Sequence, residues 1–199
     1  MNLFAALLLS AASPVWAAEE TPDGLIRRLS NEMLEGIKSD PSIRHGDVTR
    51  IISLVDQKIM PNVDFQRMTA SAVGRYWKQA TPDQQTRLQN EFKLLLVRTY
   101  SGALSQVSTE QTVELKPMRS TPTDAEVVVR TEIRGKGDPI QLDYRLEKTG
   151  ASWKIYDVNV LGVWLVENYR NSFAQEIGAN GIDGLIAKLA ERNKAAAKS

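Results

Sequence analysis

The sequence of 199 residues contains no cysteine. This absence excludes disulfides, thiolate metal sites, thiol nucleophiles and the lipid-modified cysteine that anchors bacterial lipoproteins. The single histidine, His45, lies in the polar turn SIRHGD, where no second histidine or cysteine can complete a catalytic or metal site. The HExxH, GxSxG and GxxxxGKS/T motifs are also missing, so zinc proteases, hydrolases with a nucleophile elbow and P-loop enzymes lose their main sequence support.

Neither sign of charge dominates, because 25 lysine and arginine residues nearly balance 24 aspartate and glutamate residues. The formal net charge is +1, and the chain has no arginine-rich arm or repeated basic cluster. Such a chain has no strong field with which to attract a phosphate backbone. We therefore expect no nucleic-acid partner.

Long apolar runs are also scarce, and the clearest one stands at the N-terminus. It extends from Leu3 to Ala12, about half of the roughly 20 residues that a membrane-spanning helix needs. Small residues then lie at the positions that signal peptidase reads for cleavage after Ala17 or Ala18. This pattern predicts a cleavable signal peptide over residues 1–18 and export of the rest of the chain. The remaining residues, 19–199, suffice for one domain around a single core.

Helix boundaries are marked by Thr21 and Thr81, each of which precedes a proline, as is typical of an N-cap followed by the first helical residue. Gln84, three residues after Thr81, is placed to complete a capping box. Apolar residues recur at helical spacing in six segments. We expect helices over 22–39, 48–59, 64–77, 82–105, 163–178 and 181–193.

Apolar and polar residues alternate with a period of two after residue 112, which is typical of strands with one buried face. Short turns at STPTD (120–124) and GKGDP (135–139) separate these runs, so neighbouring strands should be antiparallel. We expect strands around 113–115, 127–133, 140–148 and 153–160. The predicted fold class is α+β, with a strongly curved antiparallel sheet of about four strands packed by N-terminal and C-terminal helices.

Large apolar side chains are concentrated on the central helices, on the third expected strand and in the segment after Gly162. In that last segment Leu165, Tyr169 and Phe173 recur every four residues and share one face of a helix. Such residues can wall a cavity for an apolar ligand, and each can equally belong to an ordinary core. The candidate ligand-binding residues are Tyr76, Trp77, Phe92, Leu96, Tyr100, Leu142, Tyr144, Val163, Trp164, Tyr169 and Phe173.

An enzymatic alternative places a carboxylate beside a hydroxyl donor in an apolar pocket, with Asp143 or Asp157 as general base and Tyr144 or Tyr156 as donor. Strand alternation opposes this role for Asp143, which shares a face with polar residues and should be solvated. Asp157 has the parity of Ile155 and could face inward. A third alternative is a purely structural periplasmic adaptor, whose core would be filled and without a cavity.

Three stretches carry motifs that occur together in one protein family. The segment between Pro61 and Leu104 contains GRYWKQATPDQQ, residues 152–173 read SWKIYDVNVLGVWLVENYRNSF, and residues 181–189 read GIDGLIAKL. Together they resemble the MlaC family of periplasmic phospholipid-binding proteins, also called toluene-tolerance proteins. Trp164 departs from the small residue that the family pattern has there, which affects the size or the entrance of the expected pocket.

This resemblance implies a sheet of the NTF2-like kind whose cavity holds phospholipid acyl chains, with the headgroup toward solvent. Such a cavity should approach or exceed the upper end of the roughly 300 to 1,000 Å³ typical of ligand sites. Arg75, Lys78 and Arg170 are the candidates for headgroup contact. If Trp164 lies beside the lipid, Trp164→Ala should alter lipid occupancy or chain-length selection.

The resemblance also implies a carrier without catalysis, with phospholipid as cargo and with no metal or other cofactor. The implied partners are an inner-membrane ABC transporter complex with its substrate-binding MCE protein and an outer-membrane lipoprotein-porin complex. The protein would shuttle phospholipid between the two membranes and help to maintain lipid asymmetry in the outer membrane. The enzymatic alternative becomes an NTF2-like enzyme acting on a small apolar substrate.

Overall fold

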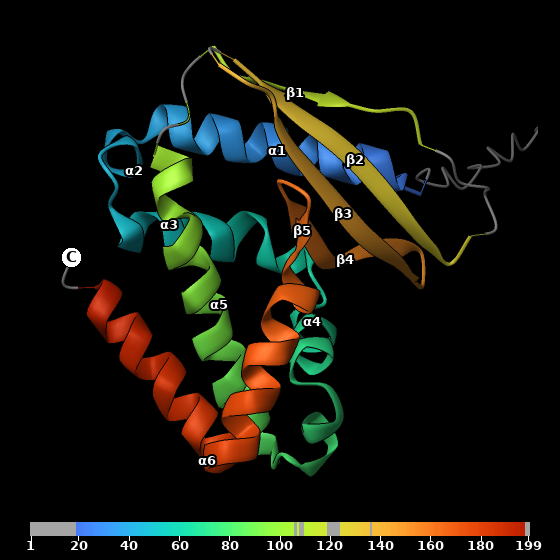
Figure 1. Cartoon of the computed structure of the whole chain (residues 1–199). Helices are drawn as coiled ribbons and strands as arrows, with labels where there is room; N and C mark the ends of the chain where they lie inside the picture. The colour runs from blue at the N-terminus through green and yellow to red at the C-terminus, as the bar shows by residue number, and fades with distance from the viewer. Residues whose placement is uncertain (1–18, 106, 108–109, 119–123, 136, 198–199) are drawn as a thin grey trace, which may run out of the picture.

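The computed structural model describes residues 19–105, 107, 110–118, 124–135 and 137–197, and the predicted signal peptide at 1–18 lies outside them. Helices precede and follow a single sheet (Figure 1). The N-terminal helical elements are α1 (Pro22–Ser39), α2 (Pro41–Arg44), α3 (Val48–Lys58), η1 (Met60–Asn62), α4 (Phe65–Val73), η2 (Gly74–Gln79) and α5 (Pro82–Ser105). They are followed by β1 (Thr112–Leu115), β2 (Glu126–Arg134), β3 (Ile140–Thr149), β4 (Ser152–Val160), β5 (Val163–Trp164) and α6 (Leu165–Ala196).

The predicted helix starts are confirmed by hydrogen bonds at the caps. The Thr21 hydroxyl oxygen accepts from the backbone N–H of Gly24 at 3.2 Å, at the start of α1. At the start of α5, the Thr81 hydroxyl accepts from Gln84 N–H at 3.2 Å and the Gln84 side chain accepts from Thr81 N–H at 3.0 Å. These reciprocal bonds form the capping box that the sequence predicts.

Two glycines interrupt helical segments. Gly74 has φ +65°, which ends α4, and the chain continues to Gln79 as the 3-10 helix η2 rather than as the single helix expected over 64–77. Gly181, with φ 73° and ψ −179°, divides α6 into two arms. The two helices expected over 163–178 and 181–193 are therefore the arms of one kinked element.

The sheet is antiparallel throughout, with strand order β1-β2-β3-β4-β5, so the predicted α+β class is confirmed. Within the described residues it has five strands rather than about four, because the chain folds back after Val160 and adds Val163 and Trp164 beside β4. Leu161 (φ 53°) and Gly162 (φ 89°) make this tight reversal. The N–H of Gly162 is held by the Asn159 side chain at 2.8 Å.

A β-bulge at Tyr156 changes which residues of β4 face each side of the sheet. Leu146 pairs with Ile155, whereas Arg145 pairs with Asp157, so Tyr156 is an extra residue in β4. Ile155 thus shares the face of Leu146, which packs toward α1, and Asp157 shares the opposite face with Arg145. We call these the α1 face and the outer face. The shared face that parity predicted for Asp157 and Ile155 is therefore wrong, although Asp157 is buried, at 1% exposure, on the outer face.

Buried apolar residues form three clusters. The aromatic cluster lies among α4, α5 and α6, the α1-sheet cluster lies between α1 and the strands, and a third cluster joins α1, α2, α3 and α5. The aromatic cluster comprises Met68, Ala72, Val73, Leu88, Phe92, Leu95, Val166, Tyr169, Phe173, Ile177, Leu185, Ile186 and Leu189. The α1-sheet cluster comprises Leu25, Ile26, Leu29, Val127, Val129, Leu146 and Ile155.

Candidate functional site

An apolar cavity of about 190 Å³ lies between α1 and the α1 face of the sheet. Helix α1 contributes Ile26, Leu29, Ser30, Met33, Leu34 and Ile37. The strands contribute Val113, Ile133, Leu142, Tyr144, Ile155 and Val158, and Ile59, Val63 and Val107 complete the lining. The cavity exists because one stripe of α1 faces alternate residues of four strands without filling the space between them.

The lining is almost entirely hydrocarbon. No described residue that lines the cavity carries a charge, and Ser30 and Tyr144 are the two described lining residues with a hydroxyl in the side chain. Such a wall suits an apolar ligand and offers nothing to a strongly polar one. A purely structural core without a cavity, the third alternative, does not match this geometry.

The volume is smaller than the expectation drawn from the family resemblance. About 190 Å³ lies below the roughly 300 to 1,000 Å³ typical of ligand sites, whereas the expected cavity was at the upper end of that range. The physical reason is that α1 packs closely on part of the sheet. Ile26 and Leu29 of α1 are 1% and 3% exposed and join Val129 and Leu146 in the α1-sheet cluster.

Two of the predicted ligand-binding residues, Leu142 and Tyr144, line this cavity. Three others, Phe92, Tyr169 and Phe173, lie together in the aromatic cluster instead. The ring centroid of Phe92 is 5.1 Å from that of Tyr169 and 5.2 Å from that of Phe173, both in edge-to-face geometry. Mutual packing accounts for the burial of these rings. Tyr76, Trp77 and Leu96 are partly buried against the same cluster.

The remaining predicted residues occupy other places. Tyr100 is half-buried on α5, and burial together with nearby Tyr169 raises its pKa. Val163 is 49% exposed in the reversal before α6. Trp164 pairs with Asn159 in β5, and the Arg145 guanidinium lies 3.8 Å from the centroid of its indole ring. This contact places Trp164 on the outer face, away from the cavity lining.

The main set that sequence reasoning missed is the stripe on α1. Its apolar spacing predicts an amphipathic helix, but the same spacing serves an ordinary cover for a sheet. The one sequence signal is Ser30, a hydroxyl in the middle of that stripe. Whether the apolar stripe of α1 packs on the sheet without a gap depends on the distance between the helix and the sheet. The order of residues along the chain does not specify that distance.

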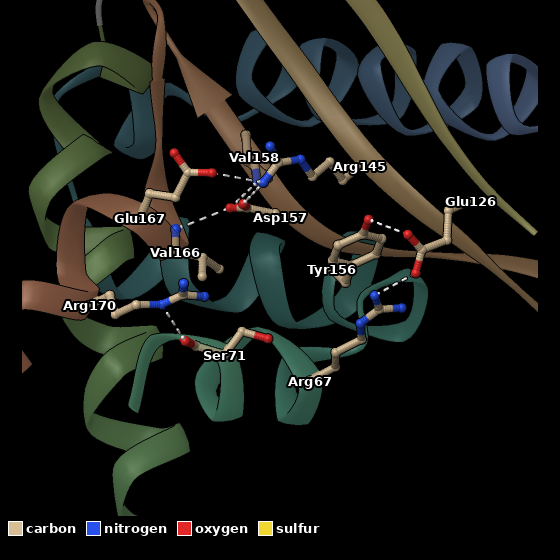
Figure 2. A network of polar contacts seen from close by, with 10 residues as sticks. All are labelled: Arg67, Ser71, Glu126, Arg145, Tyr156, Asp157, Val158, Val166, Glu167 and Arg170. Carbon is tan, nitrogen blue, oxygen red and sulfur yellow. Dashed lines mark hydrogen bonds and ion pairs between the residues drawn. The ribbon is translucent and has the colours of Figure 1, made fainter. Parts of the chain in front are cut away.

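The three headgroup candidates lie elsewhere. Arg75 is exposed and donates to the Tyr76 hydroxyl at 2.9 Å. Arg170 Nε donates to the Ser71 carbonyl at 3.1 Å, joining α6 to α4 (Figure 2). Lys78 is exposed in η2. None of the three is among the described residues that line the cavity.

Asp157 accepts several hydrogen bonds on the outer face, at the start of α6 (Figure 2). It is 1% exposed, and its Oδ1 accepts from the N–H groups of Val158 at 2.9 Å and Val166 at 3.1 Å. Arg145 donates to its Oδ2 at 3.1 Å and also reaches Glu167 at 3.3 Å. Burial raises the pKa of Asp157, while the two backbone N–H groups and Arg145 act in the opposite direction.

A second charged group lies farther along the outer face. Arg67 of α4 pairs with Glu126 at 2.6 Å and with Glu147, and its guanidinium lies 3.7 Å from the ring centroid of Tyr156. Tyr156 in turn donates to Glu126 at 3.1 Å. The hydrogen bond from Arg67 is the main cause of the lowered pKa of Glu126. These contacts tie α4 to the sheet.

The acid and donor pairs of the enzymatic alternative do not meet in a pocket. Tyr144 faces the cavity, whereas Asp143 and Asp157 lie on the outer face and Tyr156 bonds to Glu126. The expectation that Asp143 is solvated is wrong, because it is only 6% exposed and its Oδ2 accepts from Gln141 at 2.9 Å. Within the described residues, no group of three or more His, Asp or Glu side chains is arranged to hold a metal ion.

Burial raises the pKa of Tyr144 to about 12, although a contact with Thr131 lowers it in part and Asp143 raises it further. Tyr144 is only partly exposed and lines the cavity. A phenolate there would be separated from bulk water, so the neutral form is favoured. The Tyr144 hydroxyl is therefore a neutral hydrogen-bonding group at physiological pH.

None of the helices in the described ranges is both long and apolar enough to cross a bilayer.

Comparisons with known proteins agree with this architecture. A solved phospholipid-binding protein from Ralstonia solanacearum, in complex with a phospholipid, superposes with a TM-score of 0.85 at 45% identity, covering 91% of this chain and 99% of that one.

Two relatives are similar in sequence along most of their length. The toluene tolerance protein ttg2D of Pseudomonas putida is 26% identical, over 97% of this chain and 93% of its own. The intermembrane phospholipid transport system binding protein MlaC of Haemophilus influenzae is 24% identical, over 86% of this chain and 82% of its own. The family model described as MlaC protein matches residues 27–191. The chain belongs to the MlaC family.

Proposed function

We propose that this protein is a periplasmic phospholipid carrier, with the acyl chains held between α1 and the sheet. The observation that carries the proposal is the apolar cavity in that position, in a chain 45% identical to a protein solved in complex with a phospholipid. Residues 19–199 act as a single domain in this proposal, with residues 1–18 removed on export. Leu142 and Tyr144 are the predicted lipid-binding residues that the cavity supports.

The energetics of lipid transfer favour a carrier. Two acyl chains carry about 30 methylenes, and at roughly 0.8 kcal/mol each their exposure to water costs on the order of 24 kcal/mol. An apolar cavity removes that barrier. Because bilayer and cavity are both apolar, the net transfer energy is small, and the direction of transport is imposed by the partners.

Holding two chains requires the cavity to enlarge, because about 190 Å³ is below the range of ordinary ligand sites. The α1-sheet cluster is the wall that must open. The rings of the aromatic cluster pack against one another, so we expect that cluster to stay closed when lipid binds.

The transport part of the proposal assigns two partners, an inner-membrane ABC transporter complex with its MCE protein and an outer-membrane lipoprotein-porin complex. Its support is the Haemophilus influenzae relative, which is named as the binding protein of an intermembrane phospholipid transport system. The role is non-enzymatic, since the relatives are named for binding, transport or toluene tolerance. Photocrosslinking in cells that yields no adduct with either complex would remove the transport part and leave lipid binding intact.

Lipid binding is tested by extraction and mass spectrometry of gently purified protein expressed in a bacterium. We expect stoichiometric phospholipid in the native protein. Val113 lines the cavity from the edge strand β1, and its neighbour Thr112 is exposed on the same strand. Val113→Trp should therefore lower bound lipid several-fold, while Thr112→Trp should leave it unchanged. Native protein that carries no stoichiometric lipid would argue strongly against the proposal.

A further inference from the structure

The cavity between α1 and the sheet has the volume of a ligand much smaller than a phospholipid. An apolar cavity of roughly 150 Å³ holds one benzene molecule, and the cavity of this protein, at about 190 Å³, is slightly larger. A group the size of a water molecule takes up roughly 30 Å³, so the extra volume leaves room for about one or two further carbon atoms. The cavity as it stands therefore fits one aromatic ring with a short substituent.

The walls of the cavity are well shielded from solvent. Ile26, Leu29, Ile37 and Ile155 are at most 3% exposed, and the other described lining residues are half-buried. A hydrocarbon placed among them is removed from water, and that removal is the main source of affinity for an apolar ligand. The cavity is thus a binding site of defined size rather than a shallow surface groove.

The chemistry of the lining favours a neutral hydrocarbon. All described lining residues other than Ser30 and Tyr144 have apolar side chains. A carboxylate or ammonium group would enter without an ion-pair partner, which is strongly unfavourable. Met33 of α1 and Tyr144 of β3 belong to the residue types that make favourable contacts with aromatic rings. A compact aromatic hydrocarbon therefore matches the cavity in both size and chemistry.

We propose that the cavity of the lipid-free protein binds one small aromatic hydrocarbon, between benzene and ethylbenzene in size, and that this ligand excludes phospholipid. The exclusion rests on the proposed function, in which the α1-sheet cluster opens to admit acyl chains. The hydrocarbon fits the closed cavity, whereas the lipid requires the open one, so each ligand lowers the affinity for the other. A small apolar solute thus inhibits lipid loading without resembling a lipid.

The size match is tested by calorimetric titration of delipidated protein with benzene and its n-alkyl derivatives up to hexylbenzene. We expect one molecule to bind per chain. In an apolar phase of unlimited volume, each added methylene raises the affinity about fourfold. In this cavity we expect that gain for the first one or two carbon atoms and none thereafter. A fourfold gain that continues as far as hexylbenzene would refute the size match.

The location is tested with variants that fill the cavity. Val113→Trp fills it from β1, and Thr112→Trp is the matched control at the exposed neighbouring position. Ser30→Leu fills it from α1, with exposed Ser53→Leu on α3 as its control. Each filling variant should weaken benzene binding by about tenfold or more, and neither control should change it. Thermal unfolding identifies any variant that is not folded, and benzene binding that survives in both filling variants would exclude this cavity as the site.

Reloading with phospholipid separates this inference from the carrier function. Delipidated protein is incubated with diacyl phospholipid vesicles, separated from them, and then titrated with benzene. We expect the lipid-loaded protein to bind no benzene. Equal benzene binding by loaded and delipidated protein would overturn the exclusion. Lipid loading without benzene binding to the delipidated protein would overturn the hydrocarbon site and leave the carrier function standing, whereas benzene binding without any lipid loading would do the reverse.

Discussion

The pKa of Tyr144, which lines the cavity, makes protein stability depend on pH. Its folded-state pKa of about 12 exceeds the ordinary value of about 10, so the folded protein keeps the phenol proton over a pH range in which the unfolded chain loses it. The resulting contribution to stability is present below about pH 10 and is lost as the pH rises through about 12. The free energy of unfolding should therefore fall over that interval.

The prediction is checked by titrating tyrosinate absorbance in native protein and in Tyr144→Phe. The variant should lack the component that ionises near pH 12, and its unfolding free energy should depend less on pH above about 10. Tyr156→Phe, on the outer face, should retain that component. If the component survives in Tyr144→Phe, Tyr144 is not the buried phenol that the geometry indicates.

Residue identity alone predicted some local features and not others. The capping residues Thr21 and Thr81 were predictable because a cap depends on residues within one helical turn. Leu142 and Tyr144 were predictable as inward residues because alternation is regular along β3. Asp143 was not, because its burial depends on neighbours from other strands.

The start of α6 shows an element whose boundary is set from outside its own sequence. Trp164 stands at the N-cap position without a side-chain cap bond, and Asp157 of β4 accepts from the N–H of Val166 instead. A buried acceptor for an N-terminal N–H stabilises a helix by about 1 kcal/mol, and removing it also leaves Arg145 without its buried partner.

We predict that Asp157→Ala lowers the free energy of unfolding by about 2 to 3 kcal/mol, and that Asp157→Asn costs less than half as much. The asparagine keeps an oxygen that can accept from Val158 and Val166, whereas alanine keeps none. Urea unfolding at neutral pH measures both values. Glu167→Gln, which alters only the exposed partner of Arg145, is the control and should be nearly neutral. Equal losses in the two Asp157 variants would show that the cap bonds are not the source of the stability.

Element types and most helix bounds followed from periodicity, but two features of the sheet did not. The strand β5 has only two residues, too few for any periodic signal, and it exists because the chain reverses at Leu161 and Gly162. The bulge at Tyr156 depends on pairing between β3 and β4. Neither is encoded in the residue pattern of a single strand, so the orientation of Asp157 could not be obtained from sequence.

At the scale of the whole molecule, acyl chains have two candidate locations, the cavity between α1 and the sheet and the aromatic cluster. Amide hydrogen exchange distinguishes them. If lipid binds between α1 and the sheet, loading delipidated protein should slow exchange most strongly in α1 and in β2 to β4. The aromatic cluster contains the predicted residues Phe92, Tyr169 and Phe173, so lipid bound there should protect α5 and α6 instead. Strongest protection in the first arm of α6 would contradict the cavity assignment.

The size of the cavity is the property that sequence could least supply. A composition of 42% hydrophobic residues is ordinary and cannot reveal whether apolar surfaces meet or leave a gap. The apolar residues of α1 have the same spacing whether the helix packs directly on the sheet or leaves a cavity beside it. Packing distances between elements far apart in sequence decide that question.

The separation of the aromatic cluster from the cavity bears on how such a chain can diverge. Val63 and Val158 pack against both the aromatic cluster and the α1-sheet cluster, and they form the physical link between them. Substitutions elsewhere in the cavity wall act at a distance from the rings that hold α4, α5 and α6 together, so their effects on the two regions add nearly independently. Evolution can therefore reshape the cavity of this fold while its helical scaffold stays under separate selection.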